Sequence, residues 1–218
     1  MNKTFTEQLM LAPARRERGG GNATAFTLVE MLIVIAIIAL LASLVVGLAG
    51  GAAEKKNRAR VETELHQIET AIEHYKEKLG YYPPDNTNDA SMQPLFYELT
   101  GTKFDPTNNE YITVAGERVS PNTVVKIFFR GGFANSSAPG AEISAKNFFP
   151  TIKAGQHKKM VTAFGPVELL TVPVELVPGQ VNTWRYVKTN PTNNTASFDL
   201  WAEIRIRGKT VLIPNWKH

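Results

Sequence analysis

The feature that most constrains this chain is a run of 23 residues without a charged side chain, residues 31–53. As one α-helix, such a run is about 35 Å long, enough to cross the roughly 30 Å hydrocarbon core of a bilayer with a modest tilt. Secretory signal peptides usually have a shorter apolar stretch of about 7 to 15 residues before a cleavage site of small residues. The run therefore predicts a membrane-spanning helix within residues 26–53. Cleavage as a secretory signal at the small residues 49–53 stays open as the simpler alternative.

The charged residues around this run leave its orientation open. Basic residues lie on both sides of it, so the excess of positive charge that marks a cytoplasmic flank is not visible. Glu30 directly precedes the run, although an ionised carboxylate in hydrocarbon is costly unless it is paired. Glu30 therefore either lies at the level of the lipid headgroups or has a partner of opposite charge. The basic residues are Arg15, Arg16 and Arg18 before the run, and Lys55, Lys56, Arg58 and Arg60 after it.

Composition limits the rest of the chain. With 218 residues, of which 43% are hydrophobic, it can form one sizeable globular domain beside the apolar segment. The absence of cysteine excludes a disulfide framework, a thiol nucleophile and a thiolate metal site. The formal charge is only +4, so the basic composition is no argument for nucleic acid as a partner. We also expect no enzymatic activity, because the phosphate-binding glycine loop, the HExxH motif and the GxSxG motif are all missing.

The residues around Phe26 resemble a known processing signal. A basic leader with a small residue at its end, followed by FTLVEML and a long apolar helix, is similar to the cleavage and methylation motif of type IV prepilins and type II secretion pseudopilins. The resemblance implies that a prepilin peptidase cuts between Ala25 and Phe26 on the cytoplasmic side and then N-methylates Phe26. It also implies that residues 1–25 are a cleaved cytoplasmic leader and that the chain after the span is periplasmic. Most family members have Gly before the cut, and whether the small residue Ala25 slows cleavage stays open.

The resemblance also supplies a partner for Glu30. Cleavage creates a positive amine at Phe26, and in this family Glu30 of an incoming subunit would pair with the Phe26 amine of its neighbour in a growing filament. Two opposite charges in the same layer of lipid offset each other's desolvation cost, and pairing between subunits sets their register. We therefore expect Glu30 and the Phe26 amine to form the charge pair for assembly.

Residues 54–80 continue the helix with an amphipathic pattern. Their apolar positions advance by three or four residues, which places them on one face of an α-helix. Gly80 suits the C′ position, and the prolines that follow cannot continue the helix. His66 and His74 lie eight residues apart, so we interpret them as surface groups rather than as metal ligands. The apolar positions are Val61, Leu65, Ile68, Ile72, Tyr75 and Leu79.

Residues 81–218 are expected to form a globular head. The clearest pattern predicts an antiparallel meander of three strands at 184–188, 197–206 and 209–213, with a tight turn at Arg207 and Gly208. The part of the head before this meander has a less regular pattern. It predicts a short helix at 94–101, a loop to residue 114, a strand or buried segment at 122–129, an irregular insertion at 134–165, and an edge strand or two short strands at 167–177.

The end of the chain resembles the major pseudopilin of type II secretion, through SFDLW at 197–201 and Asn215-Trp216, and so does the GYYP phrase at 80–83. In that family a loop rich in Gly and Asp follows the first phrase and binds calcium. Residues 202–209 here are AEIRIRGK, with three cations and one carboxylate, whereas calcium takes about six to eight oxygen ligands. We therefore expect that the calcium site is lost, that no cofactor is needed, and that Asp199 is a structural or capping residue. A strand hairpin would replace the ion as the stabilising element.

These observations predict an α+β, pilin-like fold in which a long N-terminal helix, membrane-spanning in its first half, packs on a small head with a C-terminal antiparallel sheet. The resemblance implies a structural subunit of a type II secretion pseudopilus that polymerises through this helix to drive export of folded proteins across the outer membrane. The implied partners are the prepilin peptidase, other copies of the chain, minor pseudopilins, the inner-membrane assembly platform and the lipid bilayer. The implied location is the bacterial inner membrane, followed by a periplasmic filament.

Two alternatives stay open. One is a type IV pilus subunit, major or minor, serving adhesion, motility or DNA uptake. The other is a signal-anchored envelope protein that never polymerises.

Overall fold

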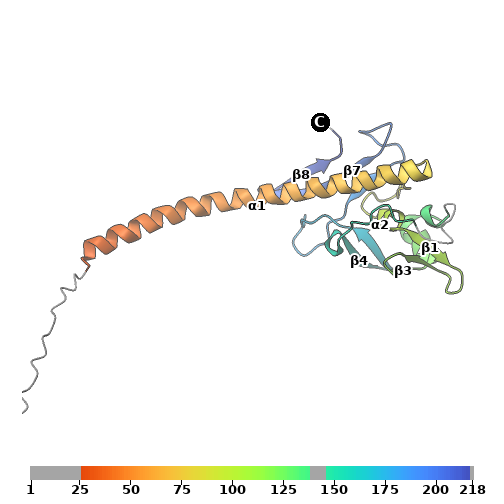
Figure 1. The fold of residues 1–218 in the computed structure, drawn as a ribbon, viewed down its shortest axis with the longest axis horizontal. Helices are drawn as coiled ribbons and strands as arrows, with labels where there is room; N and C mark the ends of the chain where they lie inside the picture. The colour runs from red at the N-terminus through yellow and green to blue at the C-terminus, as the bar shows by residue number, and fades with distance from the viewer. Residues whose placement is uncertain (1–25, 138–145, 217–218) are drawn as a thin grey trace, which may run out of the picture. The chain divides into compact units, whose positions relative to one another are not determined.

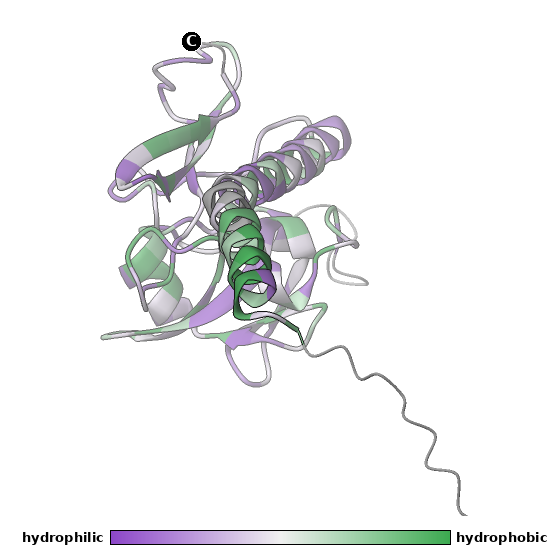
Figure 2. Ribbon diagram, turned by 90° about the vertical axis from the view of Figure 1, so that its left-hand side faces the viewer, coloured by the Kyte–Doolittle hydropathy of each residue, from purple (hydrophilic) through white to green (hydrophobic). Residues whose placement is uncertain are grey.

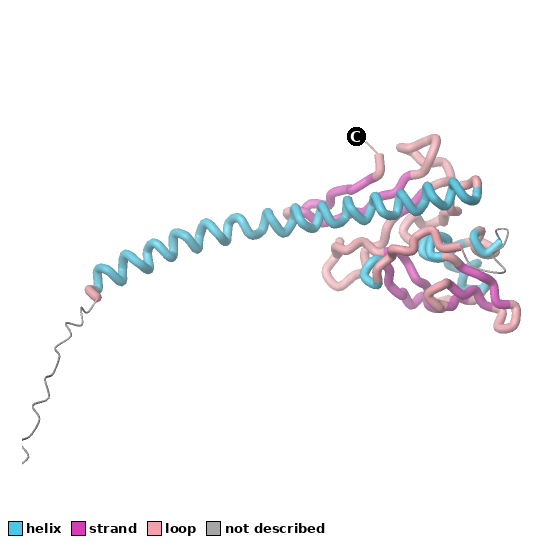
Figure 3. The backbone as a smooth tube through the Cα atoms, viewed as in Figure 1, coloured by secondary structure: helices cyan, strands magenta, loops and turns pink. Residues whose placement is uncertain are grey.

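The structure is a computed structural model that describes residues 26–137 and 146–216, except for the side chains of residues 44–50. The chain divides into two units, Met1–Gly47 and Leu48–His218. The expected leader, including Ala25, lies outside the described residues. Figure 1 shows the element order, and Figure 3 distinguishes helices, strands and loops.

The first unit contains the beginning of helix α1 (Leu28–Leu79). Its described side chains are almost all apolar, as the hydropathy colouring of Figure 2 shows, and they are exposed within the chain. Leu28, Val29 and Leu40 have exposed fractions of 76%, 63% and 64%. Among the residues that the structure describes, no helix combines the length and the hydropathy that crossing a membrane requires.

In the second unit, the amphipathic part of α1 packs against the head, as predicted. Val61, Ile72 and Tyr75 have no exposed surface, and Leu65 and Ile68 are at most 3% exposed. The helix ends as expected at Leu79, where Gly80 adopts a φ of 84° and its N–H donates to the Lys76 carbonyl at 2.8 Å. A left-handed residue at C′ is the usual end of a helix. The periodic apolar pattern therefore identified both the buried face and its end.

In its described residues, the head contains three small antiparallel sheets and short helices. The first sheet has the order β1 (Thr102–Asp105), β2 (Glu110–Thr113) and β3 (Arg118–Val119). The second pairs β4 (His157–Thr162) with β5 (Gly165–Leu170), and the third has the order β6 (Arg185–Val187), β7 (Asp199–Ile206) and β8 (Lys209–Pro214). The helical elements are α2 (Leu95–Thr100), α3 (Pro121–Phe128) and the single 3₁₀ turns η1 (Asn135–Ser137) and η2 (Ala154–Gln156).

The C-terminal meander and the short helix α2 are confirmed. The strands β7 and β8 pair from Ile206↔Lys209 to Trp201↔Pro214. Arg207 and Gly208 have φ values of 49° and 77°. Positive φ at both central residues is the hallmark of a type I′ turn, whose twist matches that of the strands it connects.

The strand prediction at 122–129 is wrong, because this segment is helix α3. Ser120 caps the helix by accepting a hydrogen bond from the Thr123 N–H at 3.1 Å, and Pro121 occupies its first turn. These two residues are a strong helix-start signal. Val124 and Phe128, four residues apart, then bury one helical face, so the start signal and the helical spacing outweigh the β-branched and aromatic composition.

Two other predictions for the head need correction. The expected loop up to residue 114 contains the hairpin β1–β2, and the segment 134–165, expected to be irregular, contains β4. Residues 138–145 of that segment lie outside the described residues. Both hairpins pair strands of only four to six residues, too short for a clear alternating pattern. The predicted edge strand at 167–177 is confirmed in part, since β5 ends at Leu170 and only Thr171 pairs further on, with Thr183.

Candidate assembly site

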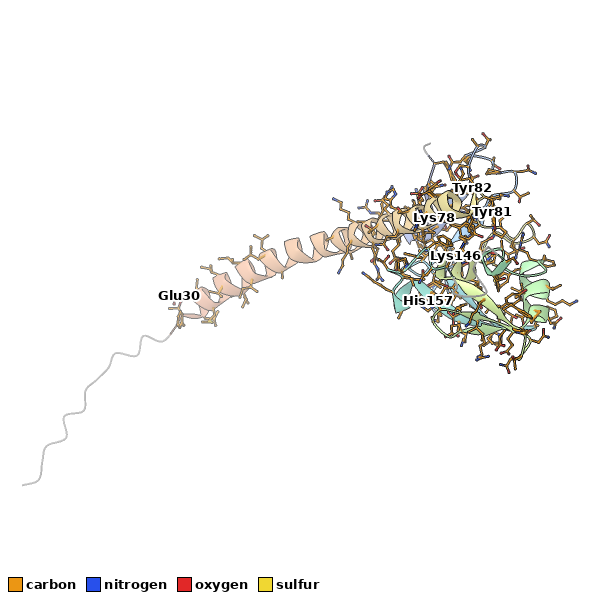
Figure 4. The ribbon with its side chains drawn as sticks, turned by 45° about the vertical axis from the view of Figure 1, so that its right-hand side comes forward. Glu30, Lys78, Tyr81, Tyr82, Lys146 and His157 are labelled. Atoms are coloured by element: carbon orange, nitrogen blue, oxygen red, sulfur yellow. The ribbon has the colours of Figure 1, made fainter. Side chains whose placement is uncertain are left out.

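The N-terminal end of α1 is closed by a reciprocal contact between Thr27 and Glu30. The Glu30 N–H donates to Thr27 Oγ1 at 3.2 Å, while Glu30 Oε2 accepts from the Thr27 N–H at 2.8 Å and from its hydroxyl at 2.9 Å. This is a capping box, which satisfies backbone donors that the first turn of a helix leaves without partners. Figure 4 shows Glu30 at this end of the helix.

Glu30 therefore has a structural role that the sequence interpretation missed. The spacing Thr-x-x-Glu before an apolar run is sufficient to predict the cap. Among the described residues, Glu30 Oε1 accepts no hydrogen bond, so one carboxylate oxygen caps the helix and the other stays available. Phe26, four residues earlier in the sequence, is 73% exposed. The expected pairing of Glu30 with the Phe26 amine stays a prediction, because Ala25 lies outside the described residues.

Asp199 holds the loop before β7, which confirms its expected role as a structural residue. Its Oδ2 accepts from the N–H groups of Thr192 and Asn193 at 2.9 Å and from the Asn193 side chain at 3.0 Å. Its Oδ1 accepts from the Asn194 N–H at 2.8 Å. Asn215 acts similarly, since its side chain accepts from the Leu200 N–H and donates to the Phe198 carbonyl. These residues of the two C-terminal phrases thus fix the start of β7 and the end of β8.

The turn between β7 and β8 contacts α1 through Arg207. The Arg207 N–H donates to Glu54 Oε1 at 3.1 Å, and its guanidinium Nε lies 3.4 Å from Glu54 Oε2. A shallow cavity of about 260 Å³ lies at this contact, lined also by Gly51, Lys55, Arg58 and Ile206. Sequence alone could not reveal this contact, because 153 residues separate its partners.

A fully buried carboxylate joins α1 to the head. Glu98 on α2 has no exposed surface, and its Oε2 accepts from the Tyr75 hydroxyl at 2.9 Å and from the Asn135 N–H at 2.8 Å. Its Oε1 accepts from the Ala134 N–H at 2.7 Å. Burial raises the pKa of Glu98, against the opposing effect of these hydrogen bonds. In the sequence, the only indication of this buried carboxylate is that a Glu stands inside the apolar stretch LFYELT.

Asp85, a few residues after the C-terminal end of α1, plays a comparable part. It is 3% exposed, and it accepts hydrogen bonds from the Lys188 and Thr189 N–H groups and from the Thr189 hydroxyl. Burial alone would raise the pKa of Asp85, but these hydrogen bonds together outweigh it and lower the pKa. Asp85 thus fixes the chain that leaves β6.

The two helix histidines lie on the surface of α1, as expected. The side chain of His66 is 75% exposed and its Nδ1 lies 2.8 Å from Glu69 Oε2, while His74 contacts the edge of Phe148. A third histidine, His157 on β4, is labelled in Figure 4. Its Nδ1 lies 3.0 Å from Glu168 Oε2. In the described part of the chain, no three His, Asp or Glu side chains come together as a metal site would require.

Comparison with known proteins places this sequence in a family. The family described as the prokaryotic N-terminal methylation motif matches residues 21–46, which include Ala25, Phe26 and Glu30. The type II secretion system core protein G of Escherichia coli K12 is 32% identical over 101 residues, which are 41% of this chain and 70% of that protein. The chain belongs to the family of the type II secretion system core protein G.

Other members of the core protein G family match over shorter stretches. The protein of Klebsiella pneumoniae is 38% identical over 81 residues, which are 37% of this chain and 51% of the relative. The protein of Vibrio cholerae is 36% identical over 77 residues, which are 35% of this chain and 51% of the relative. The chain thus spans about half the length of these two curated relatives. No solved structure matches the chain closely enough for comparison.

Proposed function

We propose that this chain is a structural subunit of a type II secretion pseudopilus. The observation that carries the proposal is the first part of α1, where the described apolar side chains are exposed all around the helix. A helix that is apolar on every side is normally covered by lipid or by other apolar surfaces. Within this chain nothing in the described residues covers it, so lipid and then the same helix of other copies are the natural partners.

The processing motif supports a pathway in which the helix lies first in lipid and then against the same helix of other copies. In this proposal, prepilin peptidase cuts between Ala25 and Phe26 and methylates Phe26, with the helix in the inner membrane and the head in the periplasm. The Glu30 carboxylate of an arriving subunit then pairs with the Phe26 amine of a neighbour. Since Oε2 caps the helix, Oε1 is the oxygen free to accept that amine.

The work of the subunit is mechanical. Growth of a short periplasmic filament from the assembly platform, with minor pseudopilins among its subunits, would drive folded proteins through the outer membrane. We propose no catalytic step for the chain itself, whose family is one of structural subunits. The relatives, which are type II secretion system core proteins, favour secretion over a type IV pilus.

We also propose that the chain needs no calcium at its C-terminal edge. Both carboxylate oxygens of Asp199 already accept N–H groups at 2.8 to 3.0 Å, and such donors occupy the positions in which a cation would bind. The hairpin β7–β8, with six paired positions, would stabilise the edge in place of the ion.

The capping box allows a sharp test of the charge pair. Glu30→Gln keeps an oxygen that can cap Thr27 but removes the charge, and it should leave a processed, membrane-inserted monomer that fails to form filaments. Thr27→Val removes the hydroxyl of the cap but keeps the charge, and it should still assemble. Filament yield would be measured by sedimentation and imaging, and processing by N-terminal sequencing.

Two results would contradict this proposal. Normal filaments from Glu30→Gln would refute the charge pair while leaving the subunit role intact. An unprocessed N-terminus, together with a chain that stays monomeric at every concentration, would refute the subunit role and favour a non-polymerising envelope protein.

A further inference from the structure

Basic side chains gather near the start of the second unit, from two distant parts of the sequence. Some lie in residues 55–60 of α1, and the others lie at the tip of the β7–β8 hairpin. The two groups are neighbours because Arg207 of the tip binds Glu54 of α1 through its N–H and its guanidinium. We call this group the basic cluster, which consists of Lys55, Lys56, Arg58, Arg60, Arg205, Arg207 and Lys209.

Ion pairs neutralise only part of the basic cluster. Arg58 pairs with Glu62, Arg60 with Glu64, and Arg207 with Glu54. The remaining side chains are exposed, and among the described residues no acidic group forms an ion pair with them. These unpaired cations are Lys55, Lys56, Arg205 and Lys209. The surface therefore keeps a net positive charge that an anionic partner would offset.

The position of the cluster along α1 identifies the class of partner. The uncharged run ends at Ala53, and residues 55–60 follow within about 10 Å along the helix at 1.5 Å per residue. That distance is close to the Debye length of about 8 to 10 Å in physiological salt. If the run lies in the bilayer, as in the proposed function, the cluster lies within reach of the charged headgroups. Each Lys or Arg so placed strengthens attachment to an anionic membrane surface about fivefold.

We propose that the basic cluster docks on anionic lipid headgroups, with the β7–β8 tip as a second contact point beside α1. This inference rests on the membrane anchor in the proposed function. A single helix leaves the head free to swing, whereas a second contact held to the helix by the Arg207–Glu54 pair orients the head against the membrane. Assembly into a filament must break this contact as the subunit leaves the lipid. The alternative partner for the basic cluster is an acidic surface on a second copy of the chain.

A label on the hairpin can measure the docking directly. The chain has no cysteine, so Thr210→Cys, an exposed position next to Lys209, carries a fluorophore at one site. The full-length chain is placed, one copy per nanodisc, in phosphatidylcholine alone or in phosphatidylcholine mixed with phosphatidylglycerol. Each nanodisc also contains a lipid whose headgroup carries a nitroxide quencher. Docking predicts stronger quenching in the anionic nanodiscs and loss of that difference at high salt.

Charge variants test whether the basic cluster causes the stronger quenching in anionic nanodiscs. Arg205→Gln with Lys209→Gln removes two unpaired cations and should lower the ratio of docked to free hairpin about 25-fold, at about fivefold per cation. Lys103→Gln with Lys126→Gln removes the same charge from exposed positions on β1 and α3 and should leave the ratio unchanged.

The outcomes separate this proposal from the proposed function. Equal quenching in both lipids, or a response to both double variants alike, would overturn the docking while the anchor stands. Quenching that appears only when nanodiscs hold two copies would instead assign the cluster to a second chain and overturn the lipid proposal. A chain that enters neither nanodisc would overturn the anchor itself, and the docking with it.

Discussion

The hydrogen bond between Tyr75 and Glu98 connects the long helix to the head, and we expect Tyr75→Phe to weaken the fold measurably. Neither residue has any exposed surface, and the Tyr75 hydroxyl lies 2.9 Å from Glu98 Oε2. Phe preserves the ring and its packing against Phe148, so the change removes one hydrogen bond without creating a large cavity. The free energy of unfolding should fall by about 1 to 3 kcal/mol, the range for a buried bond to a carboxyl group.

The same substitution should change the pH dependence of stability. Because burial raises the pKa of Glu98 above its ordinary value of 4.5, the native chain holds this proton more tightly than the unfolded chain. The stability from this group is therefore complete below about pH 4.5 and falls as the pH rises through the native pKa. Tyr75→Phe removes a donor that favours the charged form, so this fall should move to higher pH. Glu98→Gln should abolish it.

The assay is urea unfolding of the full-length chain in detergent, followed by the fluorescence of buried Trp184. Tyr111→Phe is the matched control, because its hydroxyl makes only a long contact of 3.4 Å to the Gly131 carbonyl. That control should lose less than about 0.5 kcal/mol. If Tyr75→Phe is no more destabilising than Tyr111→Phe, or if Glu98→Gln retains the pH-dependent fall, the role assigned to this bond is refuted.

Three further predictions concern loops and caps. The lowered pKa of Asp85 means that its stabilisation is present above about pH 3.8 and lost as the pH falls through the native pKa, and Asp85→Asn should remove this acid sensitivity in urea titrations. Asp199→Ala should speed amide exchange at Asn193 and Asn194 by releasing their N–H groups, whereas added calcium should not change the melting temperature of the natural chain. Ser120→Ala should cost about 1 kcal/mol through loss of the α3 cap, and an unchanged urea midpoint would contradict it.

The sequence by itself determined the features that depend on local spacing. The stripe from Val61 to Tyr75, the helix end at Gly80 and the turn at Arg207 and Gly208 were all predictable, because helix periodicity and turn geometry involve residues close in the chain. The processing motif around Phe26 is local as well, and the family comparison agrees with it.

Other features were local but carried conflicting signals. The segment 122–129 has the composition of a strand, yet Ser120 and Pro121 start a helix there. Thr27 and Glu30 form a helix cap whose Thr-x-x-Glu spacing is visible in the sequence. The charge of Glu30 nevertheless led to its interpretation as half of the assembly charge pair rather than as a cap. In both cases, hydrogen bonds to the backbone at the start of a helix decided between the alternatives.

Only the tertiary structure decided which distant groups meet. It placed Glu98 against Tyr75 and Asn135, Asp85 against Thr189, and Arg207 against Glu54. A polar group taken out of water must find a partner, but the partner's identity depends on the folded path of the whole chain rather than on neighbouring residues. The basic cluster arises in the same way, since its two halves become one surface only after the hairpin packs beside α1.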